Sequence, residues 1–213
     1  LAKDAIVGLA PTAENAKMLK RVQAQAARAM LGLAADNATT QGLIAKTDGI
    51  PPLITLIKKS SPEAQQHAAC ALWHLASQGE NRTIIVEAGG IKPLISMLAA
   101  HAGDSYDDVH NELAAVILVR LSRGNADVAV EIAEKGGVIP LVKRLAEGSR
   151  GSCQQAASCL TELALVSRNR DIIANAGGID ATTPLLCSPS VGTPEVAARL
   201  LAHLALSDTH PAH

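Results

Sequence analysis

Residues 90–94 read Gly-Ile-Lys-Pro-Leu, and this phrase decides the fold because near-copies of it recur along the chain. The other copies begin at Gly49, at Gly137 and, in a decayed form, at Gly178, so that successive copies lie about 41 to 47 residues apart. A left-handed glycine commonly ends a helix, and proline is favoured at the first position of the next helix. We therefore predict that each phrase is a corner between two helices, with a left-handed glycine and with the proline at the start of the second helix.

The corners are flanked by segments of helical character. Short apolar segments precede the four corners, at 42–46, 82–88, 128–135 and 171–176. A second apolar stretch and then a longer Ala-rich helix follow each corner. The Ala-rich helix carries its own phrase, which aligns without gaps in five copies at 27–34, 69–76, 115–122, 157–164 and 198–205. The first, fourth and seventh positions of this phrase, mostly Ala, Leu and Leu, share one helical face, which we predict is buried.

The composition supports an all-α fold. The 213 residues are 48% hydrophobic, yet they include one Trp, one Tyr and no Phe. Any core must therefore be built from Ala, Leu, Ile and Val. Such side chains suit close packing of helices, whereas strands favour aromatic and β-branched residues, so an all-β fold is close to excluded.

With these two phrases the chain resembles the armadillo-repeat family, in which repeats of about 42 residues, each of three helices, stack into a right-handed superhelix. The resemblance implies a single domain over 1–213. We divide it into a partial repeat, three full repeats and a degenerate one, at 1–35, 36–77, 78–122, 123–166 and 167–213. HEAT repeats are the near alternative, but they lack the short first helix and the Gly-Gly-Ile-x-Pro corner.

Two segments depart from the repeat. In the last copy Ala181 stands where the other corners carry proline, and residues 182–184, Thr-Thr-Pro, predict a late and shortened second helix. In the third repeat the extra residues fall in 101–110, which we expect to be an acidic loop that is solvated or contacts a partner. It does not fit a calcium loop, because Val109 stands where glycine is needed and Ala115 where glutamate is needed.

The resemblance also implies a function for the third helices, which in this family line a concave groove that binds extended peptides of protein partners. The nuclear-import adaptors of the family carry a ladder of Trp and, four residues on, Asn. The Trp positions here hold Arg28, Cys70, Val116, Ser158 and Arg199. The Asn positions hold Gly32, His74, Arg120, Glu162 and His203. With no Trp or Asn at these places, an import receptor is rejected, and the mixed charges do not match the long basic groove of β-catenin.

Trp73 lies beside this ladder and is its strongest candidate for a binding hot spot, since interface anchors are enriched in Trp. The alternative is that Trp73 packs between the third helices of adjacent repeats. Arg120 and Glu162 occupy equivalent rungs, so they could pair with each other across the groove floor rather than contact a ligand. The predicted protein-binding residues are thus Trp73 with Arg28, Cys70, His74, Val116, Arg120, Ser158, Glu162, Arg199 and His203.

The spacing of the candidate residues argues against catalytic and metal sites. His67 and His74 lie seven residues apart, about 10 Å along a helix, which is too far for one metal ion. No phosphate loop, GxSxG or GxGxxG motif is present, so we expect no cofactor, no metal and no enzyme. The basic cluster of Lys17, Lys20, Arg21 and Arg28 lacks interleaved aromatic residues, which argues against nucleic-acid binding.

The charge balance and the cysteines bear on partners and location. The 19 basic and 20 acidic residues give no overall field that would attract nucleic acid or an anionic membrane. The four cysteines include no CxxC pair, which favours free thiols in the cytoplasm. We expect no direct membrane insertion. Because the chain starts at Leu1 without Met, a natural N-terminus and any lipid anchor on it could be missing.

We therefore expect a non-enzymatic scaffold or adaptor that binds an extended segment or a helix of a protein partner in the concave groove. The chain looks most like the small armadillo-only scaffolds, some of which are acylated, tether organelles and recruit motor or signalling proteins. This resemblance implies a place on the cytosolic face of an organelle membrane. The alternative is a structural module of a larger assembly, such as a cilium or a multidomain protein, without a groove role.

Overall fold

A computed structural model describes residues 13–35, 37–99, 105–190 and 192–206, and within these ranges the regular structure is helical throughout. The helices are α1 (Ala13–Ala34), α2 (Ala38–Lys46), α3 (Ile50–Lys59), α4 (Pro62–Leu75), α5 (Gly79–Glu87), α6 (Ile91–Ala99), α7 (Ser105–Ser122), α8 (Ala126–Glu134), α9 (Val138–Glu147), α10 (Arg150–Ala164), α11 (Ser167–Asn175), α12 (Gly178–Thr182), the 3₁₀ helix η1 (Thr183–Cys187) and α13 (Thr193–Leu204). The all-α prediction is confirmed. The short helices that precede the corners begin two to four residues earlier than the apolar pattern indicated.

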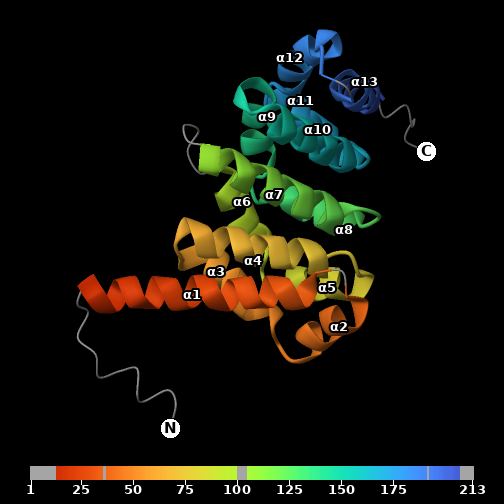
Figure 1. Ribbon diagram of the computed structural model, residues 1–213. Helices are drawn as coiled ribbons and strands as arrows, with labels where there is room; N and C mark the ends of the chain where they lie inside the picture. The colour runs from red at the N-terminus through yellow and green to blue at the C-terminus, as the bar shows by residue number, and fades with distance from the viewer. Residues whose placement is uncertain (1–12, 36, 100–104, 191, 207–213) are drawn as a thin grey trace.

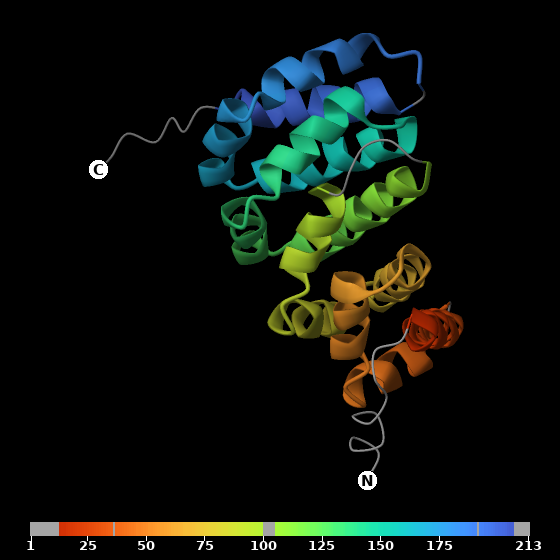
Figure 2. The same cartoon turned by 90° about the vertical axis from the view of Figure 1, so that its left-hand side faces the viewer.

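The helices form a solenoid of stacked triplets (Figures 1 and 2). The long third helices α1, α4, α7, α10 and α13 lie side by side, each in contact with the next. The second helices α3, α6, α9 and α12 form a parallel row of their own. A side chain on the third-helix row therefore lies near side chains from equivalent positions of the neighbouring repeats.

The core is built from small aliphatic side chains, as the composition requires. In α4, α7 and α10 the predicted face is buried, with Leu72, Leu118 and Leu160 fully enclosed. The prediction is wrong at the ends of the row, where Leu33 in α1 is 53% exposed and Ala198 in α13 is exposed. The physical reason is that no further helix among the described residues covers the outer faces of α1 and α13.

The corners exist, but their glycines were assigned to the wrong role. The left-handed residue is the one before each predicted glycine, with φ of 74° at Gly89, 82° at Gly136 and 83° at Gly177. The second glycine, such as Gly137 with φ −69° and ψ −21°, is right-handed. It is required for space, because a Cβ atom at Gly90 would lie 2.8 Å from the carbonyl oxygen of Ile85.

The corner prolines do not begin the second helices. Helices α3, α6 and α9 begin at Ile50, Ile91 and Val138, so that Pro93 and Pro140 are the third helical residues. This position is tolerated because the first-turn amides of a helix have no partner within it, so proline costs no hydrogen bond there.

The two departures from the repeat also differ from expectation. In the last copy α12 begins at Gly178, so the second helix does not begin later than in the other repeats. It is short, because it spans five residues before the chain continues as the 3₁₀ helix η1. In the third repeat α7 begins at Ser105, so 105–110 is helix rather than loop. The rest of the expected loop, 101–104, lies outside the described residues.

Candidate functional site

The third-helix row is hollowed between α1, α4 and α7, and this hollow holds about 690 Å³. We call it the central groove. Its walls are Leu31 of α1, Cys70, Trp73 and His74 of α4, Val109, Glu112, Leu113, Val116 and Arg120 of α7, and Gln155 of α10. Five of the predicted residues therefore come together in one place: Cys70, Trp73, His74, Val116 and Arg120.

The centre of the groove is a stack of three side chains. The guanidinium carbon of Arg120 lies 4.4 Å from the centroid of the Trp73 ring, which is a cation–π contact. Nη1 of Arg120 also donates a hydrogen bond of 3.4 Å to the backbone carbonyl of Trp73. The His74 ring meets the Trp73 ring edge-on, with centroids 4.7 Å apart. The stack fixes the orientation of both rings before any partner binds.

Trp73 packs on the core, as one of the two interpretations expected, and it also lines the groove, where its role as a binding hot spot remains a prediction. Its ring is half-buried and packs against the hydrophobic core, as the structural interpretation expected. The rest of the ring, with Arg120 over it, lines the groove. A large aromatic side chain that is already fixed in place loses little conformational entropy when a ligand contacts it.

The predicted pairing of Arg120 with Glu162 is wrong, because Arg120 engages Trp73 and no ion pair joins it to Glu162 within the described residues. Partial burial, and then the positive charges of Arg123 and Arg82, lower the pKa of Arg120 from its ordinary value. Arginine nevertheless remains charged at neutral pH. The groove is therefore positively charged at Arg120, on which the charges of Arg123 and Arg82 act from outside the groove, and among the described residues no carboxylate is paired with it.

The groove also has an acidic residue at its opposite end. The carboxylate of Glu112 lies against Gly151, in the first turn of α10. An anionic side chain is favourable next to a helix N-terminus, so Glu112 has a structural role there. Burial raises the pKa of the Cys70 thiol, which keeps this residue an apolar wall rather than a thiolate.

The remaining predicted rungs do not line the central groove. Arg28 is exposed on α1, and Ser158 uses its hydroxyl within α10, where it donates 2.9 Å to the carbonyl of Gln154. Arg199 pairs with Glu195 of its own helix at 3.6 Å. Glu162 and His203 are half-buried on α10 and α13. These rungs follow the third-helix row, but the hollow ends before them.

Half of the residues that line the central groove do not lie at the Trp or Asn positions of the ladder and were not predicted. Glu112 and Leu113 lie four and three residues before Val116, Val109 lies seven before it, and Gln155 lies three before Ser158. Residues three, four and seven apart share one helical face. Extending each rung by one or two turns toward the start of its helix would therefore have found these four residues, whereas the fifth, Leu31, lies three residues after Arg28, toward the end of its helix.

The described residues show few other sites of chemistry. All four cysteines are free, and burial strongly raises the pKa of Cys159. Across the described part of the chain, no three His, Cys, Asp or Glu side chains gather as a metal ion would require. In the same ranges, no helix combines the length and apolarity that a membrane span needs.

Comparisons with known proteins agree with this architecture. Residues 42–77 match the family model of the Armadillo/beta-catenin-like repeat. A curated relative, U-box domain-containing protein 12 of Oryza sativa subsp. japonica, is 30% identical over 101 residues, which are 47% of this chain and 16% of that protein. The chain thus spans about a sixth of the curated relative it matches.

Solved structures match over most of the chain. An engineered protein is 30% identical with a TM-score of 0.77, over 87% of this chain and 74% of that one. A designed armadillo repeat protein in complex with the peptide (KR)4 has 22% identity and a TM-score of 0.75, over 84% and 74% of the two chains. The armadillo-repeats-only protein of Plasmodium falciparum has 20% identity and a TM-score of 0.74, over 85% and 79%.

The fold and these matches define the class: an α-solenoid of armadillo repeats. This chain belongs to the armadillo-repeat family.

Proposed function

We propose that the protein is a non-enzymatic adaptor whose central groove binds an extended segment or a helix of a protein partner, with Trp73 and Arg120 as the anchors. The observation that carries the proposal is the stack of Arg120 on Trp73 inside the groove. Interface hot spots are enriched in Trp and Arg and lie near the centre of the contact. The solved complex of a designed armadillo protein with a peptide supports peptide binding by this fold.

The charges around the stack define the partner. Arg120, on which the charges of Arg123 and Arg82 act from outside the groove, makes one end positive, and Leu31, Leu113 and Val116 supply apolar walls. A segment with a carboxylate placed over Arg120 and an apolar side chain beside Trp73 satisfies both. A carboxylate can recruit an arginine that already stacks on a ring, because the guanidinium edge still has free donors. Such an adaptor acts in the cytoplasm, at the cytosolic face of an organelle where its partner places it.

The test is affinity purification with the wild type beside Trp73→Ala/Arg120→Glu, followed by titration of the captured partner. The double variant should lose at least about 2 kcal/mol of binding free energy. The matched control, Leu43→Ala/Arg168→Glu, removes an exposed apolar side chain and reverses an exposed arginine of α11 outside the groove, and it should bind as the wild type does.

Dichroism spectra of both double variants establish that the helices are intact, and Arg120→Glu alone preserves the packing of Trp73 on the core. Full affinity in Trp73→Ala/Arg120→Glu, together with loss in Tyr106→Ala/Asp107→Lys at the start of α7, would overturn the proposal. That result would move the contact from the groove to the edge of the solenoid.

A further inference from the structure

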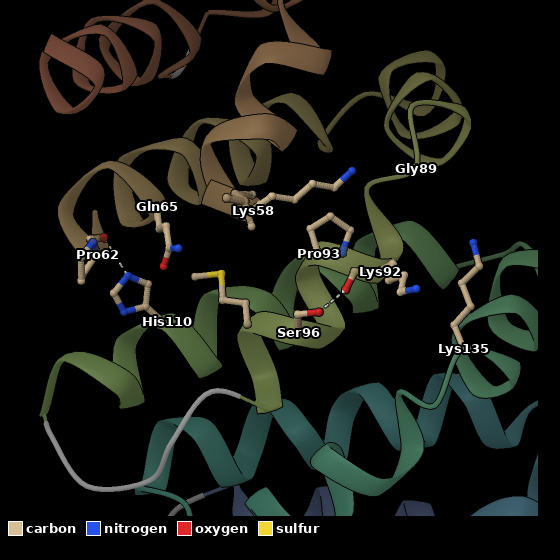
Figure 3. A pocket seen from close by; sticks show the side chains of 11 residues that line it. Lys58, Pro62, Gln65, Gly89, Lys92, Pro93, Ser96, His110 and Lys135 are labelled. Atoms are coloured by element: carbon tan, nitrogen blue, oxygen red, sulfur yellow. Dashed lines mark hydrogen bonds between the residues drawn. The ribbon is translucent and has the colours of Figure 1, made fainter. Parts of the chain in front are cut away.

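A second cavity lies on the other side of the same two repeats, among the second helices. It holds about 620 Å³ and we call it the lysine cavity (Figure 3). Its walls are formed by α3, α4 and α6, by the first half of α7 and by Lys135 after α8. It shares no residue with the central groove.

The cavity is a built feature of the fold. His110 is 5% exposed, and its ring Nε2 donates to the carbonyl oxygen of Pro62 at 3.0 Å, which ties the start of α7 to the start of α4. Ile57 and Met97 are buried beneath, and Pro93 is buried beside them. The apolar wall is therefore held in place by contacts within and between the two repeats.

The charges of the cavity have one sign. Three lysines line it, and no Asp or Glu does among the residues that the structure describes. Figure 3 shows Lys58, Lys92 and Lys135 around the end next to Gly89, while Pro62, Gln65 and His110 lie at the other end. Lys135 pairs with Glu131, but neither Lys58 nor Lys92 takes part in an ion pair among the described residues. Two ammonium groups thus face the same space without a counter-charge.

The repeat architecture does not explain these lysines. In the other corners, the position of Lys92 is occupied by Pro51, Ile139 and Asp180. In the next two second helices, the position of Lys58 is occupied by Ala99 and Ala146. Lys92 also lies in the first turn of α6, where a positive charge opposes the helix dipole. A residue that breaks a local rule without compensation within the fold points to a role outside it.

We propose that the lysine cavity binds an acidic segment of a partner protein, with carboxylates over Lys58 and Lys92 and an apolar side chain against Ile57, Pro93 and Met97. The cavity has the volume of an ordinary ligand site, which is about 300 to 1,000 Å³. Among the described residues its lining holds no Phe, Tyr or Trp ring on which a nucleic-acid base would stack, and the imidazole of His110 is 5% exposed and bonded to Pro62. A small inorganic anion would satisfy the ammonium groups but leave the apolar wall uncovered. This site is independent of the central groove, so one of them can fail without the other.

The test titrates the full chain with a fluorescent peptide of alternating glutamate and leucine. Lys58→Glu/Lys92→Glu should weaken binding by about tenfold or more, because it reverses both unpaired charges. The matched control, Lys46→Glu/Lys59→Glu, makes the same change of net charge at exposed lysines that do not line the cavity, and it should bind like the wild type. Trp73→Ala/Arg120→Glu should also leave this binding unchanged.

Two further experiments distinguish binding of an acidic, partly apolar peptide from binding of other anionic ligands. A peptide with serine in place of every leucine should bind several-fold more weakly, roughly as expected when one apolar contact is lost. Absence of peptide binding by the wild type, or equal loss in the control variant, would overturn the proposal. It would also be overturned if phosphatidylserine vesicles, rather than the peptide, responded to Lys58→Glu/Lys92→Glu.

Discussion

The corners of the solenoid and the groove face of its third helices come from the same repeat, yet only the corners keep their residues from copy to copy. The second corner glycine is present four times, at Gly49, Gly90, Gly137 and Gly178. A Cβ atom at each would lie 2.7 to 2.9 Å from the carbonyl oxygen of the isoleucine five residues earlier. On the groove face no two neighbouring repeats carry the same residue at either rung, and none of these residues is buried.

This difference separates two kinds of constraint. At the second corner position the backbone lies so close to another backbone segment that only glycine fits, and all four corners therefore have glycine there. Where a side chain faces solvent, the fold accepts many residues, so the stability of the fold does not decide among them. Substitutions at the corners should therefore change stability, and substitutions on the groove face should change binding.

The largest effect is expected at a second corner glycine. Gly90→Val would place a branched side chain against Ile85, and we expect it to lower the free energy of unfolding by roughly 3 kcal/mol. Urea unfolding followed by circular dichroism measures the change. Gly89→Val is the comparison within the same corner, since a Cβ atom there meets nothing within 4 Å but φ is 74°, and it should cost only about 1 to 2 kcal/mol. The reverse order of the two losses would contradict the steric explanation.

The next effect concerns a buried position where the repeat is broken. Arg144 in α9 stands where α3 and α6 carry Leu56 and Met97, and it is 2% exposed. Its Nε and Nη1 have no hydrogen-bond partner among the described residues. Arg144→Met should therefore raise the free energy of unfolding by about 1 to 3 kcal/mol, because the cost of burying unpaired donors is removed.

Arg199→Met is the control for this gain, because Arg199 is exposed on α13 and its change should stay within about 0.5 kcal/mol. A loss of stability in Arg144→Met would contradict the prediction.

The same difference between the corners and the groove face explains how much of the structure could be predicted from the sequence. The corners, the helix order and the buried face of α4, α7 and α10 could be predicted because sterics and burial repeat with the sequence. The left-handed residue was misplaced by one, because a glycine needed for space and a glycine needed for φ are identical in sequence. Of the site, Cys70, Trp73, His74, Val116 and Arg120 were found by register.

The rest of the site could not be found by register alone. The pairing of Arg120 depends on which of two neighbours its long side chain reaches, and the sequence gives equal support to Trp73 and Glu162. The lysine cavity depends on Lys58, Lys92 and Lys135, which lie far apart in sequence and do not repeat. Their proximity results from the packing of α6 against α3 and against α8.

A smaller effect is expected at the one corner whose left-handed residue is not glycine. Asp48 has φ 54°, where the other three corners have glycine. Asp48→Gly should raise the free energy of unfolding by up to about 1 kcal/mol, because the strain of a side chain in this region is relieved. Gly136→Asp is the reciprocal change and should lose a similar amount. Thermal melting of both variants checks the prediction, and a loss in Asp48→Gly would contradict it.

The smallest effect compares two glycines directly. Gly32 is a groove rung in the last turn of α1, exposed, and a Cβ atom there meets nothing within 4 Å. Because glycine costs a helix about 0.5 to 1 kcal/mol relative to alanine, Gly32→Ala should stabilise the protein by that amount. Gly90→Ala should destabilise it, although the chemical change is identical. Gly42→Ala in α2, which also meets nothing within 4 Å, is the control for the gain. If Gly32→Ala destabilised the protein as a corner substitution does, the groove face would be under the same backbone constraint as the corners, and its variation between repeats would need another cause than the choice of partner.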